Sequence, residues 1–488
     1  MNAVMLSRIQ FAFTIGYHFI FVPISIGLAL MIVIHERRFY KSGAEADRSA
    51  SDFWIKLFAA TFAIGVATGI TMEFAFGTNW ANYSRFVGNI FGAPLAAEAL
   101  MAFFLESAFL GVLLFGRRRV SKKLYYVSTW LMLIGSHLSA FWIIVANSWM
   151  QTPSGYKIEN GKAVLTSFWG AVFNPSTMPR LVHTLAGAWI AGSFVVAGIA
   201  AWYLLHGRHT AFARRALKTG LIAGVVFSVA MPFIGHWHAV EVANHQPIKM
   251  AAFEGIYESR DDAELTLLGW VDSKNHDVVG VGIPGGLSLL IGGSTKHIIR
   301  GLDSVPANQR PPEQLTFQSY HLMVALGMLF AFLMVVALFC YRTGRLERMR
   351  WLLWVLVIAA PLPILANELG WMAAEVGRQP WIVNGLMRTS DGVSAVVSRG
   401  HIIITLTLFA VIYLTLFVAW LRIFTGIVGR GPEAAAVAAR PAPPIGSGNA
   451  ADQLTEAASA ASPPAEPGSA ADPPAEPEAK PASRPEEM

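Results

Sequence analysis

Several apolar segments of this chain carry side chains that can bind a metal or move a proton. His18 and His183 each stand near the beginning of an apolar segment, and Met323 follows His321 at the beginning of another. An ionisable group in or near hydrocarbon is costly, so it usually marks a cofactor, a proton path or a substrate path. These residues fall in the same half of the membrane once the segments are placed, which accidental polar residues would not do.

Three carboxylates add to this set. Glu98 and Glu106 lie in APLAAEALMAFFLES, eight residues apart, or about 12 Å along a helix axis. Such spacing suits successive stations of a proton relay. Glu375 ends the long apolar run WLLWVLVIAAPLPILANELGW and is followed closely by Arg378. Glu375 therefore needs an explanation that an ordinary membrane helix does not supply.

Together, the residue types suit iron porphyrins. Haem iron takes His, Met or anionic axial ligands, and a His/Met pair is typical of an electron-transfer haem. Simpler explanations exist for each residue alone. A membrane His often hydrogen-bonds a neighbouring helix, a Met often fills a core, and Glu375 with Arg378 could be an interfacial ion pair.

The composition predicts an all-α polytopic membrane protein. The chain has 488 residues, of which 54% are hydrophobic and 14% charged, whereas soluble domains carry about a quarter charged residues. The single cysteine, Cys340, excludes an intrachain disulfide and covalent CxxCH haem attachment. The basic balance is better explained by membrane topology than by nucleic-acid binding.

Nine apolar stretches are close to the ~20 residues that span the hydrocarbon layer. They lie at about 10–34, 53–77, 94–115, 124–149, 180–205, 218–238, 316–341, 351–371 and 401–425.

Basic residues predict the orientation of these spans. The loops after the first, third, fifth and seventh spans hold 17 Lys and Arg residues, against 7 in the short loops on the other side. The positive-inside rule therefore predicts an outer N-terminus and a cytoplasmic C-terminus.

Hydropathy and composition divide the chain into four predicted parts. Residues 1–238 carry six helices with haem ligands and proton-path carboxylates, 239–315 form a long outer connection, and 316–430 carry three helices. Residues 431–488 hold nine acidic residues and 12 of the 26 prolines. This Ala/Pro/Glu-rich segment cannot bury a core and is predicted to be a disordered cytoplasmic tail.

Six motifs, in this order, resemble subunit I of the cytochrome bd-type quinol oxidases, and the resemblance covers about residues 1–426. The motifs are RIQFAFTIGYHF, FGAPLAAEALMAFFLES, NSWMQTP, VHTLAG, QPIKMAAFEG and WMAAEVGRQPW. The position two residues before Met323 is often Arg in that family but is His321 here, and the outer connection is short. Both features resemble the cyanide-insensitive branch.

The resemblance implies haem ligands. His183 and Met323 would ligate a low-spin haem b, and His18 and Glu375 would each ligate one of two high-spin haems. One of these would be haem b and the other haem d or a further haem b. Which of them takes His18 and which takes Glu375 varies within the family.

The resemblance also implies roles for other residues. Glu98 and Glu106 would be a haem-adjacent carboxylate and a proton-path carboxylate, and Lys249 and Glu254 would act on quinol. Further cofactor contacts would come from Trp371, His321 and Arg378, the last of which can pair with a haem propionate.

The resulting expectation is the haem-bearing subunit of an electrogenic quinol:O₂ oxidoreductase without a haem–copper centre, in a bacterial cytoplasmic (inner) membrane. It would oxidise ubiquinol or menaquinol at the outer face and reduce O₂ to water with cytoplasmic protons. Its partners would be subunit II, a small single-helix subunit and lipid, with no nucleic acid.

Two other functions suit parts of the sequence. A secondary transporter could use the carboxylates as proton carriers, but it predicts an internal repeat that the sequence does not show. A cytochrome b that only relays electrons would need His183 and Met323 and would give His18 and Glu375 no role.

Overall fold

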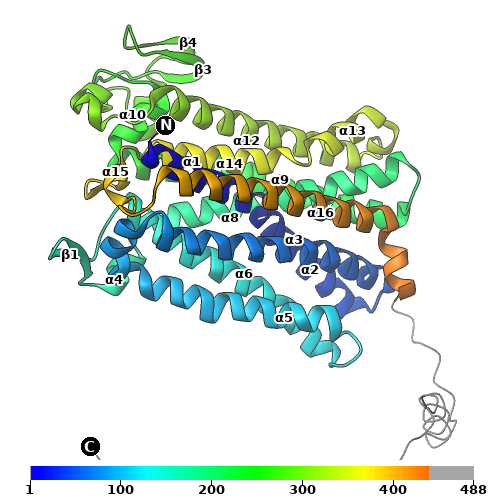
Figure 1. Ribbon diagram of the computed structural model, residues 1–488. Helices are drawn as coiled ribbons and strands as arrows, with labels where there is room; N and C mark the ends of the chain where they lie inside the picture. Colours follow the sequence, from blue (N-terminus) through cyan, green and yellow to red (C-terminus); the bar gives the residue numbers. More distant parts are fainter. Residues whose placement is uncertain (1, 439–488) are drawn as a thin grey trace, which may run out of the picture. The chain divides into compact units, whose positions relative to one another are not determined.

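The computed structural model describes residues 2–438, and these residues form a bundle of long helices (Figure 1). Nine helical segments of this described part are long and apolar enough to cross a membrane. They are Ala3–Ser42, Glu45–Thr78, Ala81–Phe115, Lys122–Gln151, Thr177–Leu205, Thr210–His245, Glu313–Arg342, Arg350–Val376 and Arg399–Pro432. Each contains one of the nine predicted spans entirely, which confirms the all-α membrane fold.

Three of these segments are interrupted where the sequence disfavours a regular helix. The first consists of α1 (Ala3–Phe19) and α2 (Val22–Ser42), and α2 has Pro23 in its first turn. The third consists of α4 (Ala81–Ala97), a π-helical turn η1 (Glu98–Phe103) and α5 (Phe104–Phe115).

The eighth segment consists of α13 (Arg350–Ala359) and α14 (Leu362–Val376), separated at Ala360 and Pro361. A proline removes a backbone donor and clashes with the preceding turn, so helices break or bend near it.

The remaining spans are single helices: α3 (Glu45–Thr78), α6 (Lys122–Gln151), α8 (Thr177–Leu205), α9 (Thr210–His245), α12 (Glu313–Arg342) and α16 (Arg399–Ala438).

The third span begins 13 residues earlier than predicted, at Ala81, because its helix continues past the apolar run. Hydrocarbon thickness limits the apolar stretch but not the length of the helix.

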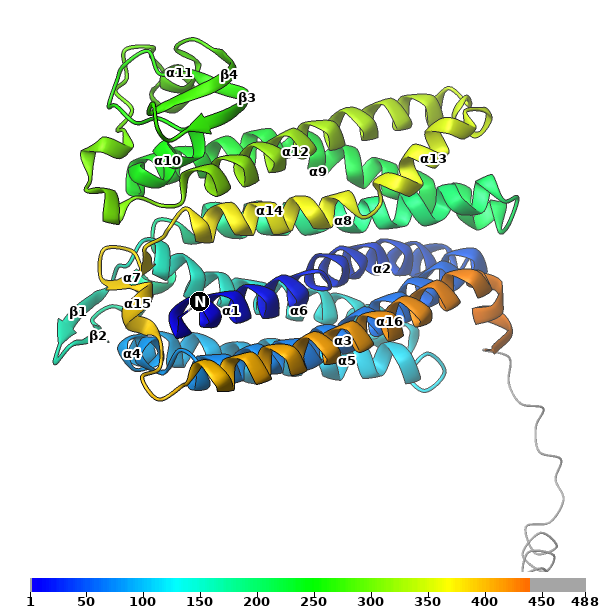
Figure 2. The ribbon, with the colours of Figure 1, turned by 45° about the horizontal axis from the view of Figure 1, so that its top comes forward.

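Helix α8 forms the centre of the bundle, and 83% of its most apolar window is buried, against 11% for α16. It contacts α2, α6, α9, α13 and α14, and Figure 2 shows α14 running along it. Gly27 of α2 and Gly192 of α8 allow the closest approach. A Cβ added to Gly27 would lie 2.5 Å from the Ala188 carbonyl oxygen and 2.6 Å from Gly192 backbone atoms.

Short elements gather at the end of the bundle where the chain begins (Figure 1). They comprise two antiparallel hairpins, a small third one and short helices. Their bounds are β1 (Tyr156–Glu159), β2 (Lys162–Leu165), α7 (Phe168–Val172), α10 (Pro247–Glu254), β3 (Leu265–Asp272), β4 (Asp277–Ile283), α11 (Gly286–Gly292), β5 (Trp381–Val383), β6 (Met387–Arg388) and α15 (Thr389–Gly392). The connection predicted at 239–315 is thus an ordered structure, and its first seven residues belong to α9.

Helix α16 kinks at Gly431, whose φ is +79°, and continues to Ala438. The kink falls where the tail was predicted to begin. Residues 439–488 lie outside the described residues, so the disordered tail stays a prediction.

Candidate functional site

Glu98 and Glu106 both face α6, although a π-helical turn separates them. Glu98 opens η1 and accepts a hydrogen bond from Ser139 at 2.7 Å. Glu106 is buried and accepts one from Ser136. Gly135 permits the approach, because a Cβ there would lie 2.8 Å from the Glu106 backbone nitrogen. Single π-turns are frequent at functional sites, and the two serines, three residues apart on α6, bring both carboxylates to one helix face.

His18 is the last residue but one of α1, just before the break that precedes α2. Its Nδ1 lies 3.0 Å from Thr68 Oγ1 on α3. A Cβ added to Gly69 would be 3.3 Å from the imidazole Cε1, so this glycine leaves room for the ring. When one ring nitrogen is held by a neighbour, the other is the one oriented for a metal.

His183 and Met323 lie on α8 and α12, and both helices contact α9 and α14. The His183 Nδ1 is buried without a hydrogen-bond partner, and its ring packs against His238 with centroids 5.3 Å apart. The Met323 sulfur is directed at α14, where a Cβ on Gly370 would lie 2.7 Å from it. The structure places the pair in one packed group of helices and leaves an imidazole nitrogen without a protein partner.

Glu375 is held by three side-chain donors. Its Oε1 accepts hydrogen bonds from Asn147 at 2.8 Å and Gln151 at 3.1 Å, and its Oε2 pairs with Arg378. Arg378 is 5% exposed and also donates to the Ile382 carbonyl. Glu375 and Arg378 therefore form the direct ion pair that was the simpler alternative for these residues, and the ligand role of Glu375 stays a prediction.

Trp371 lies four residues before Glu375 on α14. Residues four apart on a helix share a face, so Trp371 is on the side of α14 that carries Glu375.

Lys249 is connected to Glu375 through Gln151. The Lys249 ammonium is 2% exposed, donates to Gln246 Oε1 at 2.8 Å and also donates to Gln151 Oε1. Gln151 in turn donates to Glu375. Burial lowers the pKa of Lys249 well below its usual value, and the nearby Arg180 lowers it further. Lys249 is thus a buried cation, although it stands in the connection between two spans.

Glu254, at the end of α10, is as buried as Lys249 but far less hydrogen-bonded. Its carboxylate lies 3.9 Å from His321 Nε2. Burial raises the pKa of Glu254 to about 8, and the Thr266 backbone and Tyr320 only partly counter that shift. His321 also contacts the carbonyls of Phe317 and Thr266, each at 3.0 Å. His321 therefore belongs structurally with Glu254, although the sequence suggested a cofactor contact.

Five further residues belong to these groups and were not identified from the sequence. Ser136 and Ser139 donate to Glu106 and Glu98, and Asn147 and Gln151 donate to Glu375. Glu368 points toward Gly16 and has a buried Oε1 without a partner. The NSWMQTP motif contains Asn147 and Gln151, so the spacing of its two amides was the available signal.

The residues fit a metal held by a macrocycle better than a bare ion. In the described part of the chain, no three His, Cys, Asp or Glu residues cluster as ligands of a metal ion. A haem needs only one or two protein ligands. Buried atoms without partners on His183, His238 and Glu368 fit a group that would supply the missing contacts.

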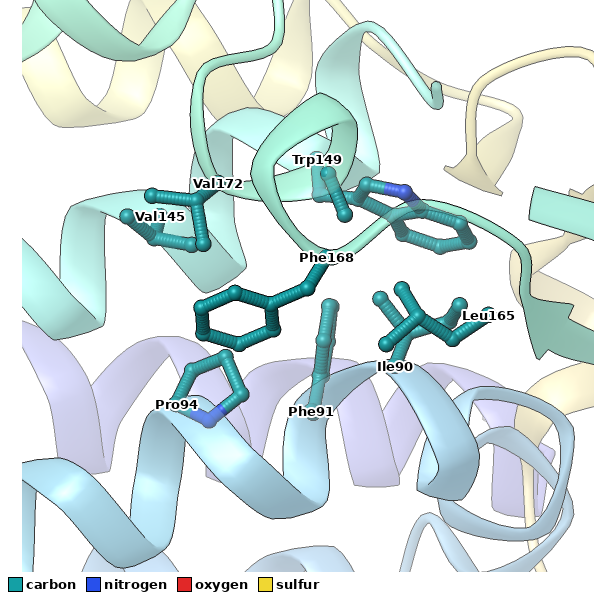
Figure 3. Close-up of a pocket in the computed structure, with 9 residues that line it drawn as sticks. Ile90, Phe91, Pro94, Val145, Trp149, Leu165, Phe168 and Val172 are labelled. Carbon is teal, nitrogen blue, oxygen red and sulfur yellow. The ribbon is translucent and has the colours of Figure 1, made fainter. Parts of the chain in front are cut away.

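A small apolar pocket lies beside Pro94, one helical turn from Glu98. Figure 3 shows hydrophobic side chains from α4, α6 and the β2–α7 segment facing one another there. Its lining residues are Ile90, Phe91, Pro94, Val145, Trp149, Leu165, Phe168, Ala171 and Val172. Its lining contains no charged side chain, so the pocket offers no acid or base.

Comparisons with known proteins agree over most of the chain. The family model for cytochrome bd terminal oxidase subunit I matches residues 6–432. The chain is 37% identical to cytochrome bd ubiquinol oxidase subunit 1 of Bacillus subtilis, over 89% of this chain and 95% of that protein. It is 34% identical to cytochrome bd-II ubiquinol oxidase subunit 1 of Escherichia coli, over 89% and 98%.

A solved structure is also similar. The bd oxidase from Geobacillus thermodenitrificans aligns with a TM-score of 0.81 and 32% identity, covering 88% of this chain and 99% of that one. At this identity and coverage the likeness extends to the whole helical bundle and not only to its motifs.

Proposed function

The chain belongs to the cytochrome bd terminal oxidase subunit I family, and from that premise we propose that it is the haem-bearing catalytic subunit of a membrane quinol oxidase. It oxidises quinol at the end of the bundle that carries α10 and β3–β4, and reduces O₂ to water. One quinol gives up two electrons and two protons, and four of each convert one O₂ into two waters.

Haem groups, when bound, carry the electrons and hold the O₂ that is reduced. His183 and Met323 hold the low-spin haem b. His18 and Glu375 each hold one of the two high-spin haems, of which one is haem b and the other haem d or b. The buried, unpartnered nitrogen of His183 and the glycines beside His18 and Met323 support these assignments.

Glu254 accepts the first proton from quinol, and Lys249 donates a hydrogen bond to a quinol oxygen. A general base works best when its pKa is near the working pH, and burial brings the pKa of Glu254 to about 8. Lys249 has three N–H donors, of which Gln246 and Gln151 occupy two. Its third donor is available to a substrate oxygen.

The hydrogen-bonded path from Lys249 through Gln151 to Glu375 is the observation that carries this proposal. Lys249, which we propose for the quinol site, is two hydrogen bonds from Glu375, which we propose as a haem ligand. A transporter or a plain electron relay has no need to join these two groups.

Glu98 and Glu106 deliver protons to the oxygen chemistry from the opposite end of the bundle. Each carboxylate is held by a serine of α6, and a serine hydroxyl can both donate and accept a proton. With the basic loops in the cytoplasm, these protons come from the cytoplasm and the quinol protons leave outside.

The subunit acts in a bacterial cytoplasmic membrane with subunit II and a small single-helix subunit, and its substrate is ubiquinol or menaquinol. The nine spans and the relatives' names support a multi-pass membrane protein of this kind.

A reduced-minus-oxidised spectrum of the purified complex tests the function. Quinol should reduce a low-spin and a high-spin haem, and carbon monoxide should perturb only the latter. Absence of haem would favour a transporter, and a low-spin haem alone would favour an electron relay. Either result would overturn the proposal.

A further inference from the structure

The β3–β4 hairpin has an apolar face that no described residue covers. Leu268 pairs with Val281 and Trp270 pairs with Val279, so these four side chains lie on one face of the antiparallel ladder. They are 69%, 67%, 64% and 69% exposed, respectively. Large exposed apolar surfaces of this kind mark interaction sites.

The opposite face of the hairpin is firmly packed on α12. Val271 is buried, and a Cβ added to Gly269 would lie 2.8 Å from Val278 and 3.2 Å from Phe317 of α12. The face with Gly269, Val271 and Val278 thus packs on the protein, and the face with Leu268, Trp270, Val279 and Val281 points away from it. The hairpin is docked on the bundle, as Figure 2 shows, so its exposed face has a fixed direction.

Three hydrogen bonds fix the hairpin's depth along α12. The Val271 amide donates to Gln314 at 2.9 Å, and Gln318 donates to the Gly269 carbonyl at 2.8 Å. His321 lies 3.0 Å from the Thr266 carbonyl. Since a helix rises 1.5 Å per residue, Gln314 and His321 differ in depth by about 10 Å. β3 therefore runs alongside the first two turns of a membrane-spanning helix.

The polarity of the hairpin also changes along the direction of α12. Its turn, DSKNHD at 272–277, is polar, and Ser273 donates to Glu313 at the start of α12 at 2.6 Å. The strand stretches 265–271 and 278–283 contain no charged residue. The polar turn therefore lies beside the start of α12. The apolar strands lie further along this helix, between the turn and the charged residues Asp261, Asp262 and Glu264 that precede β3.

Helix α12 also exposes apolar side chains at the depth of this face. Leu315 and Leu322 of α12, at the same depth, are 49% and 48% exposed on a helix that spans the membrane. In water, a bare apolar ladder would promote aggregation. Beside a membrane-spanning helix, lipid would cover such a ladder.

We propose that the β3–β4 hairpin is a membrane anchor whose Leu268, Trp270, Val279 and Val281 face contacts phospholipid in the leaflet at this end of the bundle. The inner face of the hairpin reaches His321 through Thr266, so lipid contact holds the wall of the Glu254 site against α12. The proposal requires only that the chain spans a membrane, and it does not depend on the roles given to Glu254 and Lys249.

Site-directed spin labelling of the complete oxidase in phospholipid nanodiscs tests this. Val279→Cys and Val281→Cys are labelled separately with a nitroxide, in a chain carrying Cys340→Ser. Asn275→Cys, in the polar turn, is the matched control. The measurement is relaxation of each label by O₂, which concentrates in lipid, and by a water-soluble nickel chelate.

Labels at 279 and 281 should be relaxed several times more by O₂ than by nickel, and the label at 275 should show the reverse. Equal nickel accessibility at all three positions would show a water-exposed face and overturn the proposal. Labels at 279 and 281 that neither reagent reaches would show a protein partner covering the face and would overturn it as well. Haem spectra of the labelled complexes confirm folding without reference to quinol turnover.

Discussion

Glu375 and Glu254 are two carboxylates near the same end of the bundle, the first partly buried and the second fully buried, and their surroundings differ sharply. Glu375 accepts from Asn147, Gln151 and Arg378. Glu254 has an imidazole at 3.9 Å, with the Thr266 backbone and Tyr320 beside it, and burial raises its pKa to about 8. Three donors fix the orientation of a group, whereas sparse contacts leave it able to take up and release a proton.

The difference separates a ligand from a base. A haem ligand must keep its position, and outer partners that orient ligands usually affect metal binding strongly. A base must change its charge during each turnover. Sequence position alone does not separate these roles, because both residues follow apolar helical stretches.

Replacing Glu375 should have the largest effect. Glu375→Ala removes the proposed ligand and leaves Arg378 buried without its partner, so one high-spin haem should be lost and O₂ reduction should stop with any electron donor. The measurement is haem content by pyridine haemochrome, together with O₂ uptake. Full haem content and normal uptake would break the contrast with Glu254.

Replacing a proposed ligand of the low-spin haem should have the next largest effect. Met323→Ala removes one axial bond, so the low-spin spectrum should disappear or convert to high-spin. Quinol-driven turnover should fall by more than the ~10–100-fold seen when an outer partner of a ligand is lost. Met328, five residues further along α12 and 57% exposed, provides the control Met328→Ala. An unchanged low-spin spectrum in Met323→Ala would remove Met323 from the ligand set.

How much could be predicted without the structure depends on the kind of physical signal. The nine spans follow from hydrocarbon thickness, which demands an apolar run wherever a helix crosses. The π-turn at Glu98 and the break at Ala360 depend on local backbone packing around Pro94 and Pro361, and hydropathy does not report it. The β3–β4 hairpin had a usable signal, since a polar DSKNHD turn separates two runs rich in aliphatic residues.

For the site, the sequence identified the ligand and carboxylate candidates but not their partners. Gln151 is one polar residue at a span end, and only the fold brings it between Lys249 and Glu375. The burial of Lys249 was missed for the same reason. Lys249 is held by Gln151 of α6, about a hundred residues earlier in the chain. The sequence of α10 alone does not indicate this contact.

The relay carboxylate should give an intermediate effect. Glu106→Gln keeps the shape and the contact with Ser136 but removes the exchangeable proton, so O₂ reduction should slow by about 100-fold. Haem content should stay near normal, unlike in Glu375→Ala. Single-turnover oxidation of the fully reduced complex measures this step. Parallel loss of haem and activity would make Glu106 a structural carboxylate.

Lys249 should give the smallest effect. Lys249→Ala removes one charge-assisted hydrogen bond to quinol, so KM for quinol should rise by about 10-fold while kcat changes little. Lys274→Ala, in the exposed hairpin turn, is the control. Steady-state O₂ uptake over a range of quinol concentrations separates the two constants. A fall in kcat with an unchanged KM would contradict a role in quinol binding and would indicate that Lys249 acts through Glu375.

The pH dependence of quinol oxidation in Glu254→Gln tests the central claim most directly. A base must be deprotonated to act, so kcat/KM of the parent should rise with pH through about 8. Glu254→Gln should lose about 100-fold or more in quinol-driven uptake and show no such rise, while dithionite still reduces every haem. Glu258→Gln, an exposed neighbour, should behave as the parent. A Glu254→Gln oxidase that retains the parental rate and pH profile would contradict the account.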